Sequence, residues 1–324
     1  MKKINEVLEE IKYENSLIKK KNKKFIIHTV IYLVLICILL SAVTYLTYKN
    51  QSSNLKANKR MKMERSAKIF EEQSLGNSNR NTLQAGRFLD MNNNLYVSYN
   101  GYIYKGQSEF ATIDASYLNV YKNGILCRDN ENASIAYVKN DGQIIRDRSE
   151  VKVGELLVVK DDIYYINLNN GYLYKENLKD TNTTQIYKNC KKFAIINSLL
   201  FLVTNSNTLY KIDLTTNKVI NHINNVMDFA LDNKYIYVFN GQSIYKYEWT
   251  FDKVSQVIKK ASYLIGIVSQ GIVYALDQNV YINKEKISSD IDYCQACYEG
   301  KDNYDLLMRS INANSSESII SVAK

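Results

Sequence analysis

Apolar and tyrosine residues alternate with polar residues over short stretches that recur along most of the chain. The clearest stretch is DDIYYINLNNGYLYK, residues 161–175, in which two alternating runs flank an Asn-Gly turn. Alternation with a period of two predicts β-strands with one buried face, and Asn-Gly between two such runs predicts a tight hairpin. Further copies are NNNLYVSYNGYIYK, NSLLFLVTNSNTLYKID, NKYIYVFNGQSIYKYE and QGIVYALDQNVYINKE, which begin at residues 92, 197, 233 and 270.

The copies recur at a regular spacing. With two degenerate copies at residues 123–142 and 302–311, the long strands begin near residues 95, 125, 163, 199, 235, 272 and 304, at intervals of 30 to 38 residues. Each period also holds an earlier apolar stretch, such as residues 155–160, and ends in a more polar one, such as residues 183–188. A unit of four short strands cannot bury both faces alone, but it can do so between neighbouring sheets of a ring.

The pattern therefore predicts an all-β fold, a β-propeller of about seven four-stranded blades over residues 81–324. Six blades fit the intervals if one degenerate copy is a loop. The last copy has room for about three strands before Lys324. Because propellers usually close by borrowing a strand from the other end of the chain, we expect a strand from residues 66–90 to complete the last blade.

Residues 25–48, FIIHTVIYLVLICILLSAVTYLTY, contain no Asp, Glu, Lys or Arg. About 20 apolar residues in a helix span the hydrocarbon core of a bilayer, so this run predicts a single transmembrane α-helix. A cleaved signal peptide would have a shorter apolar region followed by a small-residue cleavage site. We therefore expect a retained anchor in the cytoplasmic membrane, with the lipid bilayer as a partner.

The orientation of this helix follows from its flanks. Five lysines in KKKNKK, residues 19–24, directly precede it, and positive flanks stay in the cytoplasm. Further basic residues follow the helix, so the reverse orientation stays open. We predict a cytoplasmic tail at residues 1–24, a basic linker at residues 49–80 and a propeller outside the membrane. In the tail, residues 4–18 fit either a short amphipathic helix, through which the chain could form oligomers, or a weakly ordered segment.

The charge of the chain is unevenly distributed. The net charge is +9, yet residues 81–324 carry 26 basic and 26 acidic side chains. The excess basic charge thus belongs to the anchor region and its flanks. Because nucleic-acid-binding domains carry a basic face of their own, we expect no nucleic-acid partner.

The repeated hairpin sequence, clearest at residues 161–175 and 233–248, resembles that of bacterial propellers known as domains of unknown function. These are distantly similar to the YWTD propellers of lipoprotein receptors. The pattern extends over residues 92–311, and no copy contains a YWTD tetrapeptide. The resemblance implies a binding module of the cell surface or envelope, and it implies no catalytic residues.

Few residues of the chain are candidates for catalysis or for binding a metal ion or cofactor. Residues 81–324 contain one histidine, His222, and no nucleophile motif, metalloprotease motif or phosphate-binding loop. A Ser-His-Asp or Cys-His set cannot be built without His222, which falls in a strand at a blade edge. We therefore predict no enzyme activity, no cofactor and no metal ion. Trp249 fits either a contact at the rim or internal packing.

Cys294 and Cys297 form a CxxC motif, which occurs in redox pairs and in half-sites for zinc. Two further zinc ligands at suitable spacing are missing, and DIDYCQACYEG has the pattern of a strand rather than of the helix start of a redox site. Residues three apart in a strand point to opposite faces, which makes a disulfide awkward. We interpret the two as buried structural thiols, with a disulfide and a metal or redox site as alternatives.

Three aspartates recur at one position of the repeat. Asp114, Asp228 and Asp292 each precede a predicted innermost strand. Innermost strands line the channel of a propeller, so these carboxylates would surround one mouth and bind a cation or a basic ligand. The alternative is that they cap turns and strand starts.

These observations predict a non-catalytic, membrane-anchored protein that binds or scaffolds a protein or glycan in the cell envelope. Two alternatives remain open. One is an envelope hydrolase or lyase that uses the carboxylates of the channel. The other is an interaction platform tethered to the membrane on its cytoplasmic side.

Overall fold

The computed structural model describes residues 9–10, 12–23, 37–41, 44–45, 82–148, 150–232, 234–311 and 316–324. The chain divides into two compact units, residues 1–62 and residues 63–324. The described residues of the first unit are all helical. Most of the predicted membrane helix, residues 25–48, lies outside the described residues, and no helix among those described is both long and apolar enough to cross a bilayer.

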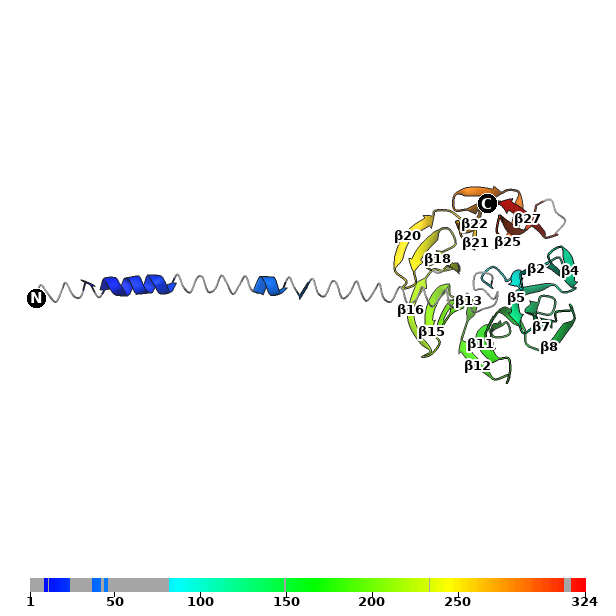
Figure 1. Ribbon diagram of the computed structural model, residues 1–324, viewed down its shortest axis with the longest axis horizontal. Helices are drawn as coiled ribbons and strands as arrows, with labels where there is room; N and C mark the ends of the chain where they lie inside the picture. The colour runs from blue at the N-terminus through cyan, green and yellow to red at the C-terminus, as the bar shows by residue number, and fades with distance from the viewer. Residues whose placement is uncertain are drawn as a thin grey trace, which may run out of the picture. The chain divides into compact units, whose positions relative to one another are not determined.

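The second unit is a ring of seven antiparallel sheets, and this confirms the predicted propeller with seven blades (Figure 1). Six blades have four strands in sequence order, and the seventh has three among the described residues. In each blade the first strand is innermost, and in blades 1 to 3 and blades 5 to 7 the innermost strands of neighbouring blades contact one another. We call the face at which the innermost strands begin the mouth face.

The first four blades contain sixteen strands. Blade 1 consists of β1 (Phe88–Met91), β2 (Asn94–Tyr99), β3 (Tyr102–Lys105) and β4 (Ser108–Ala111). Blade 2 consists of β5 (Ala115–Tyr121), β6 (Gly124–Asp129), β7 (Ser134–Val138) and β8 (Ile144–Arg148). Blade 3 consists of β9 (Val153–Val159), β10 (Asp162–Asn167), β11 (Tyr172–Asn177) and β12 (Thr183–Tyr187). Blade 4 consists of β13 (Cys190–Ile196), β14 (Leu199–Thr204), β15 (Thr208–Asp213) and β16 (Lys218–Asn224).

The last three blades contain eleven strands. Blade 5 consists of β17 (Asp228–Leu231), β18 (Tyr235–Phe239), β19 (Ile244–Glu248) and β20 (Lys253–Ile258). Blade 6 consists of β21 (Tyr263–Val268), β22 (Gly271–Leu276), β23 (Asn279–Ile282) and β24 (Glu285–Ser288). Blade 7 consists of β25 (Ile291–Glu299), β26 (Asn303–Ser310) and β27 (Ser318–Ala323).

The recurring hairpin of the sequence is the pair formed by the second and third strands of each blade. In blade 3, β10 pairs with β11 so that Tyr165 lies opposite Tyr174, and their rings stack with centroids 5.9 Å apart. The earlier apolar stretch of each period forms the innermost strand, and its side chains are buried between blades. The more polar stretch forms the outermost strand, such as β16, which is exposed along most of its length.

The largest apolar cluster joins blades 3, 4 and 5. Phe193, Phe201 and Phe229 in this cluster are fully buried, and Trp249 packs against Phe201 with ring centroids 6.0 Å apart. Trp249 is thus a packing residue. Burial of aromatic and aliphatic side chains between blades supplies the main stabilisation of such a ring, because neither face of a single blade can be buried alone.

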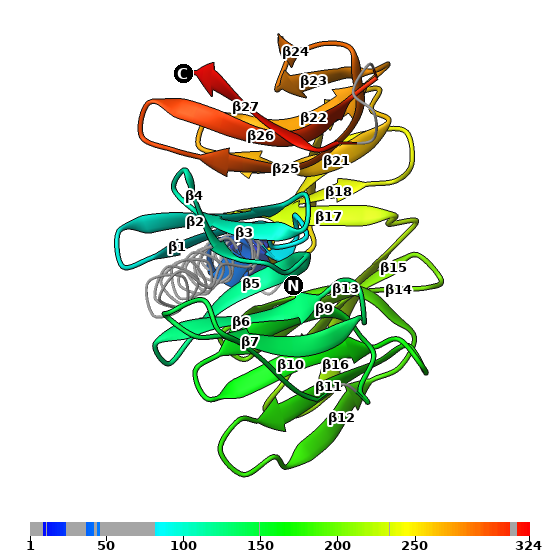
Figure 2. The ribbon, with the colours of Figure 1, turned by 90° about the vertical axis from the view of Figure 1, so that its right-hand side faces the viewer.

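The structure tests the last part of the predicted closing segment. Residues 88–90 lie in β1, the innermost strand of blade 1, rather than completing blade 7. Among the described residues, blade 7 meets blade 1 through side chains: Phe88 stacks on Tyr298 with centroids 5.5 Å apart, and the Tyr298 hydroxyl donates to Asp90. Figure 2 shows the two blades next to each other. Residues 66–81, the rest of the predicted closing segment, lie outside the described residues.

Candidate binding site at the mouth of the central channel

The segment before β1, residues 82–87, lies in the central channel of the propeller. Its backbone accepts hydrogen bonds from blade 2, from Tyr117 N–H to the Ala85 carbonyl and from Leu118 N–H to the Gly86 carbonyl, both at 2.8 Å. On the other side of the channel, Cys297 N–H of blade 7 donates to Oε1 of Gln84 at 2.6 Å. We call residues 82–87 the channel segment.

Close contacts with the surrounding blades hold the channel segment in place. Leu83 is 5% exposed and belongs to the apolar cluster of blades 3, 4 and 5. Gly86 has a φ of +57°, and a Cβ there would lie 2.3 Å from Cα of Tyr117. On blade 6, a Cβ on Gly266 would lie 2.4 Å from the side chain of Gln84. The segment is therefore held in the channel by contacts on several sides.

Seven side chains lie at the mouth end of the innermost strands, each within the first three residues of its strand or directly before it. We call this set the mouth ring: Arg87, Tyr117, Glu155, Lys192, Asp228, Tyr263 and Tyr293. Tyr117 has a φ of 54° at an irregularity of β5. Tyr263 and Tyr293 lie with ring centroids 5.3 Å apart.

The charges of the mouth ring alternate. Lys192 Nζ lies 2.5 Å from Oδ1 of Asp228 in the next blade. The Glu155 carboxylate accepts a hydrogen bond from Phe193 N–H at 2.9 Å and lies close enough to Lys192 and Asp228 for both charges to act on it. Lys192 thus lies between the carboxylate of Asp228 and the carboxyl group of Glu155. The mouth ring thus offers a ligand acidic groups, basic groups and tyrosine hydroxyls on the same face.

Glu155 has a strongly perturbed protonation equilibrium. Burial raises the pKa of its carboxyl to about 8, against the lowering effects of Lys192 and the Phe193 hydrogen bond. The folded protein therefore binds this proton more tightly than the unfolded chain does. The stability that follows is fully present below the unfolded pKa and is lost as the pH rises through the folded pKa.

We expect the free energy of unfolding to fall by about 3 kcal/mol between pH 5 and pH 8 because of Glu155. Glu155→Gln removes this part of the pH dependence, whereas Glu285→Gln, on the exposed strand β24, retains it. Urea unfolding at several pH values measures the slopes. Equal slopes for the wild type and Glu155→Gln would contradict the assignment.

The structure places the three predicted aspartates at the starts of innermost strands, as the sequence indicates, but each has its own basic partner. Asp114 lies 3.2 Å from Arg87 Nη1, and Asp228 pairs with Lys192. Asp292 lies 2.6 Å from Arg309 Nη2. In the part of the chain that the structure describes, no group of three His, Cys, Asp or Glu residues is arranged to hold a metal ion. Ligand binding by these aspartates together stays a prediction.

A pocket of about 490 Å³ adjoins the mouth ring between blades 6 and 7. Tyr263 and Asp292 line it, together with Ser262, Ala275, Asp277, Gln278 and Ile291. Next to it, the side chain of Tyr293 is 47% exposed. The Asp292–Arg309 pair is also half-exposed, with 50% and 43% of the two side chains open to solvent. This part of the mouth face combines a hollow, an exposed aromatic ring and an exposed ion pair.

Cys294 and Cys297 lie in β25 as free, buried thiols. The register of β25 shifts between Cys294 and Ala296, and both cysteines belong to the same apolar cluster between blades 6 and 7. The expectation that they point to opposite faces is therefore wrong, because this irregularity inserts a residue into the alternation. Burial raises the pKa of both thiols, to about 12 for Cys297, which disfavours the reactive thiolate.

His222 lies in β16, the outermost strand of blade 4, and is exposed. Its ring packs beside Tyr210, with centroids 5.9 Å apart, and it is remote in the topology from the innermost strands that carry the mouth ring. The sequence did not single out Arg87, Tyr117, Glu155, Lys192 or Tyr293. The signal that finds them is their shared position near the start of each innermost strand.

Several solved structures are similar to this chain. The WD40 domain of Pan2 from Neurospora crassa has 9% identical residues and a TM-score of 0.50, over 71% of this chain and 88% of that one. BamB from Moraxella catarrhalis has 10% identity and a TM-score of 0.44, over 68% of this chain and 79% of that one. PorZ from Porphyromonas gingivalis, a surface component of the type-IX secretion system, has 10% identity and a TM-score of 0.47, over 73% of this chain and 37% of that one.

The sequence matches no known family profile and no curated protein. At 9% identity and a TM-score of 0.50, the similarity to the Pan2 domain supports the propeller fold alone. The resemblance of the repeated hairpin sequence to bacterial and YWTD propellers stays a prediction.

Proposed function

We propose that this chain is a non-catalytic, membrane-anchored propeller that binds a partner protein through its mouth face. The observation that carries the proposal is the half-exposed Tyr293 beside the Asp292–Arg309 pair and the pocket of about 490 Å³. Tyrosine and arginine are enriched at protein interfaces and at their energetic hot spots. A hollow next to an exposed aromatic ring is where a side chain of the partner would insert.

Two features favour a binder over the alternative of a hydrolase or lyase. The channel segment occupies the space in which a substrate of the channel carboxylates would lie, since Leu83 and Gln84 are buried there. The three aspartates are each committed to a different cation of the chain. A carboxylate pair that acts as acid and base needs two groups that converge on one substrate atom.

The proposed location is the cytoplasmic membrane, with the propeller outside. The supporting feature is the uncharged run at residues 25–48 with five lysines directly before it. Protease added to intact, wall-stripped cells should digest a C-terminally tagged propeller while a cytoplasmic control protein survives. Protection that is lifted only by lysis would place the propeller in the cytoplasm and favour the interaction platform on that side.

The binding proposal is tested by co-purification after crosslinking in cells, with two double variants of the full-length chain. Tyr293→Ala with Arg309→Ala removes the exposed mouth residues. Val219→Ala with Val254→Ala is the matched control, because these side chains are 48% and 49% exposed but lie on the outermost strands β16 and β20. We expect a partner protein retained by the wild type and the control to fall about tenfold in the mouth variant.

Three outcomes bear on the proposal. Equal recovery with both variants contradicts binding at the mouth face. Loss with the control variant alone moves the interface to the outermost strands. If the mouth variant loses a partner that is recovered only when that partner carries a glycan, the ligand of the mouth face is a glycan rather than a protein. Thermal unfolding of each variant verifies that recovery is compared between folded proteins.

A further inference from the structure

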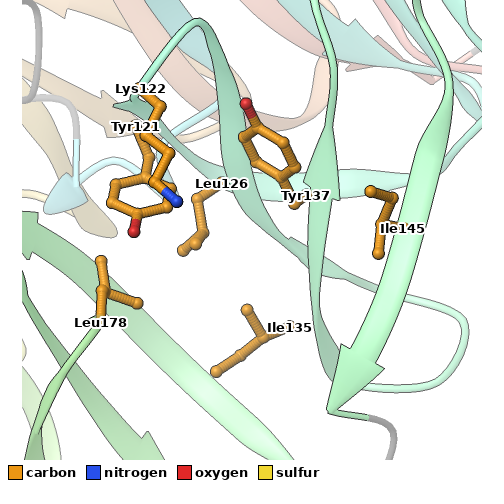
Figure 3. A pocket seen from close by; sticks show the side chains of 7 residues that line it. All are labelled: Tyr121, Lys122, Leu126, Ile135, Tyr137, Ile145 and Leu178. Carbon is orange, nitrogen blue, oxygen red and sulfur yellow. The ribbon is translucent and has the colours of Figure 1, made fainter. Parts of the chain in front are cut away.

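A second pocket lies between blades 2 and 3, at the end of the ring opposite the mouth face. Tyr121, which lines it, is the last residue of innermost strand β5, whereas the mouth ring occupies the strand starts. The cavity has a volume of about 330 Å³. It is lined by Tyr121, Lys122, Leu126, Ile135, Tyr137, Ile145 and Leu178 (Figure 3). This volume lies in the range of sites that hold small organic ligands.

The floor of the cavity is apolar. Leu126 and Ile135 are buried and belong to the apolar cluster between blades 2 and 3. Leu178, which follows β11 of blade 3, packs against the same cluster and faces the others across the hollow. A ligand that fills the cavity therefore needs an apolar body. A sugar, whose hydroxyl groups would meet these aliphatic side chains without hydrogen-bond partners, is disfavoured.

Two tyrosine rings give the cavity a shape preference. Tyr121 and Tyr137 lie at an interplanar angle of 78°, with ring centroids 6.0 Å apart. A flat ring placed in the cavity can stack on one of them and meet the other edge-to-face, the two arrangements that aromatic pairs prefer. The geometry thus favours a planar body over a branched aliphatic one.

The charge at the rim selects the polar end of the ligand. Lys122 is exposed, and its Nζ lies 5.0 Å from the centroid of the Tyr121 ring. Among the described residues, no carboxylate forms an ion pair with it, whereas nearby Lys179 is paired with Asp161 at 2.8 Å. The cavity therefore presents one available cation and two phenol groups at its edge.

We propose that this pocket binds a small organic anion with a planar, apolar body, such as an aromatic carboxylate. The body lies against the Tyr121–Tyr137 ring pair, over Leu126 and Ile135, and the anionic group faces Lys122. This site is independent of the partner-binding role of the mouth face, because the two share no residue and lie at opposite ends of the innermost strands.

The test uses three probes of one shape and different charge with the full-length chain in lipid nanodiscs. The probes are 2-naphthoate, 2-naphthylmethanol and 2-naphthylmethylamine, and binding is followed by the methyl resonances of labelled isoleucines. We expect 2-naphthoate to shift the Ile135 and Ile145 resonances, with a dissociation constant on the order of a millimolar or below. It should bind about fivefold more tightly than the neutral alcohol, the upper range for an exposed ion pair.

Two variants and a control separate the contributions. Lys122→Gln should bring the preference for the carboxylate over the alcohol to about one, while Lys284→Gln, an exposed lysine of blade 6, leaves it unchanged. Leu178→Trp should abolish the shifts for all three probes by filling the cavity. The proposal is overturned if the carboxylate has no advantage in the wild type, if Lys122→Gln retains the advantage, or if the Ile135 and Ile145 resonances do not move.

Discussion

Leu83→Asp is expected to lower the free energy of unfolding by about 3 kcal/mol or more, because it places a carboxylate without a partner among buried apolar side chains. Leu83 is 5% exposed and shares an apolar cluster with Phe193, Phe229 and Trp249. Trp249 is the only tryptophan of the chain, so its fluorescence reports unfolding in urea from the same cluster.

The matched control is Leu83→Met, which preserves volume and should cost less than about 1.5 kcal/mol. The comparison tests whether the channel segment is part of the folded core. A loss below about 1 kcal/mol for Leu83→Asp would mean that residues 82–87 leave the channel at little cost, and the mouth would then open into an empty channel.

Lys192→Met should destabilise the propeller by about 2 kcal/mol, because it leaves the half-buried carboxylate of Asp228 without its cation. The side chains of Lys192 and Asp228 are 15% and 27% exposed, and their charged atoms lie 2.5 Å apart. The pKa of Glu155, already raised by burial, should rise further once the lowering effect of Lys192 is gone.

The conservative variant Asp228→Asn tests the same network from the other side. It removes one carboxylate and leaves Lys192 next to Glu155, so we expect a smaller loss of about 1 kcal/mol. Both values come from urea unfolding at pH 7. If Asp228→Asn lowers the free energy of unfolding as much as Lys192→Met does, the stabilisation comes from the Lys192–Asp228 pair, and Glu155 does not interact with Lys192.

The strands could be predicted from the sequence because their signal is local. The second strand of each blade begins within one residue of the position given by the spacing of the hairpins, as at Asn94, Asp162 and Tyr235. Alternating apolar residues and Asn or Gly turns determine each hairpin from its own residues. The seven-bladed ring then follows, since only radial packing buries both faces of every sheet.

The contents of the channel could not be predicted, because they depend on contacts between distant parts of the chain. The channel segment TLQAGR has no alternation, and its hydrogen bond to Cys297 joins residues 213 positions apart. The bonds to Tyr117 and Leu118 likewise depend on how blade 2 folds back over it. Sequence spacing therefore indicated a closing strand within residues 66–90, of which residues 82–87 form the channel segment and residues 88–90 lie in β1.

Of the mouth ring, only Asp228 could be predicted from the sequence, again because the signal is not local. Asp228 was singled out because aspartates recur at one position, but the equivalent positions carry Tyr117, Glu155 and Lys192, which share no residue type. Their common feature is position in the repeat, and it becomes visible only when the innermost strands are aligned. Asp114 and Asp292 are neighbours of ring positions, and each forms an ion pair.

Binding of a partner protein at the mouth face is tested most directly by photo-crosslinking in intact cells. A photoreactive amino acid replaces Tyr293 at the mouth in one strain and the equally exposed Val219 on outermost strand β16 in another. We predict a discrete protein adduct from position 293 that is absent from position 219 and is lost when Arg309→Ala is added. Adducts of equal yield from both positions, or an adduct from position 219 alone, would contradict binding at the mouth face.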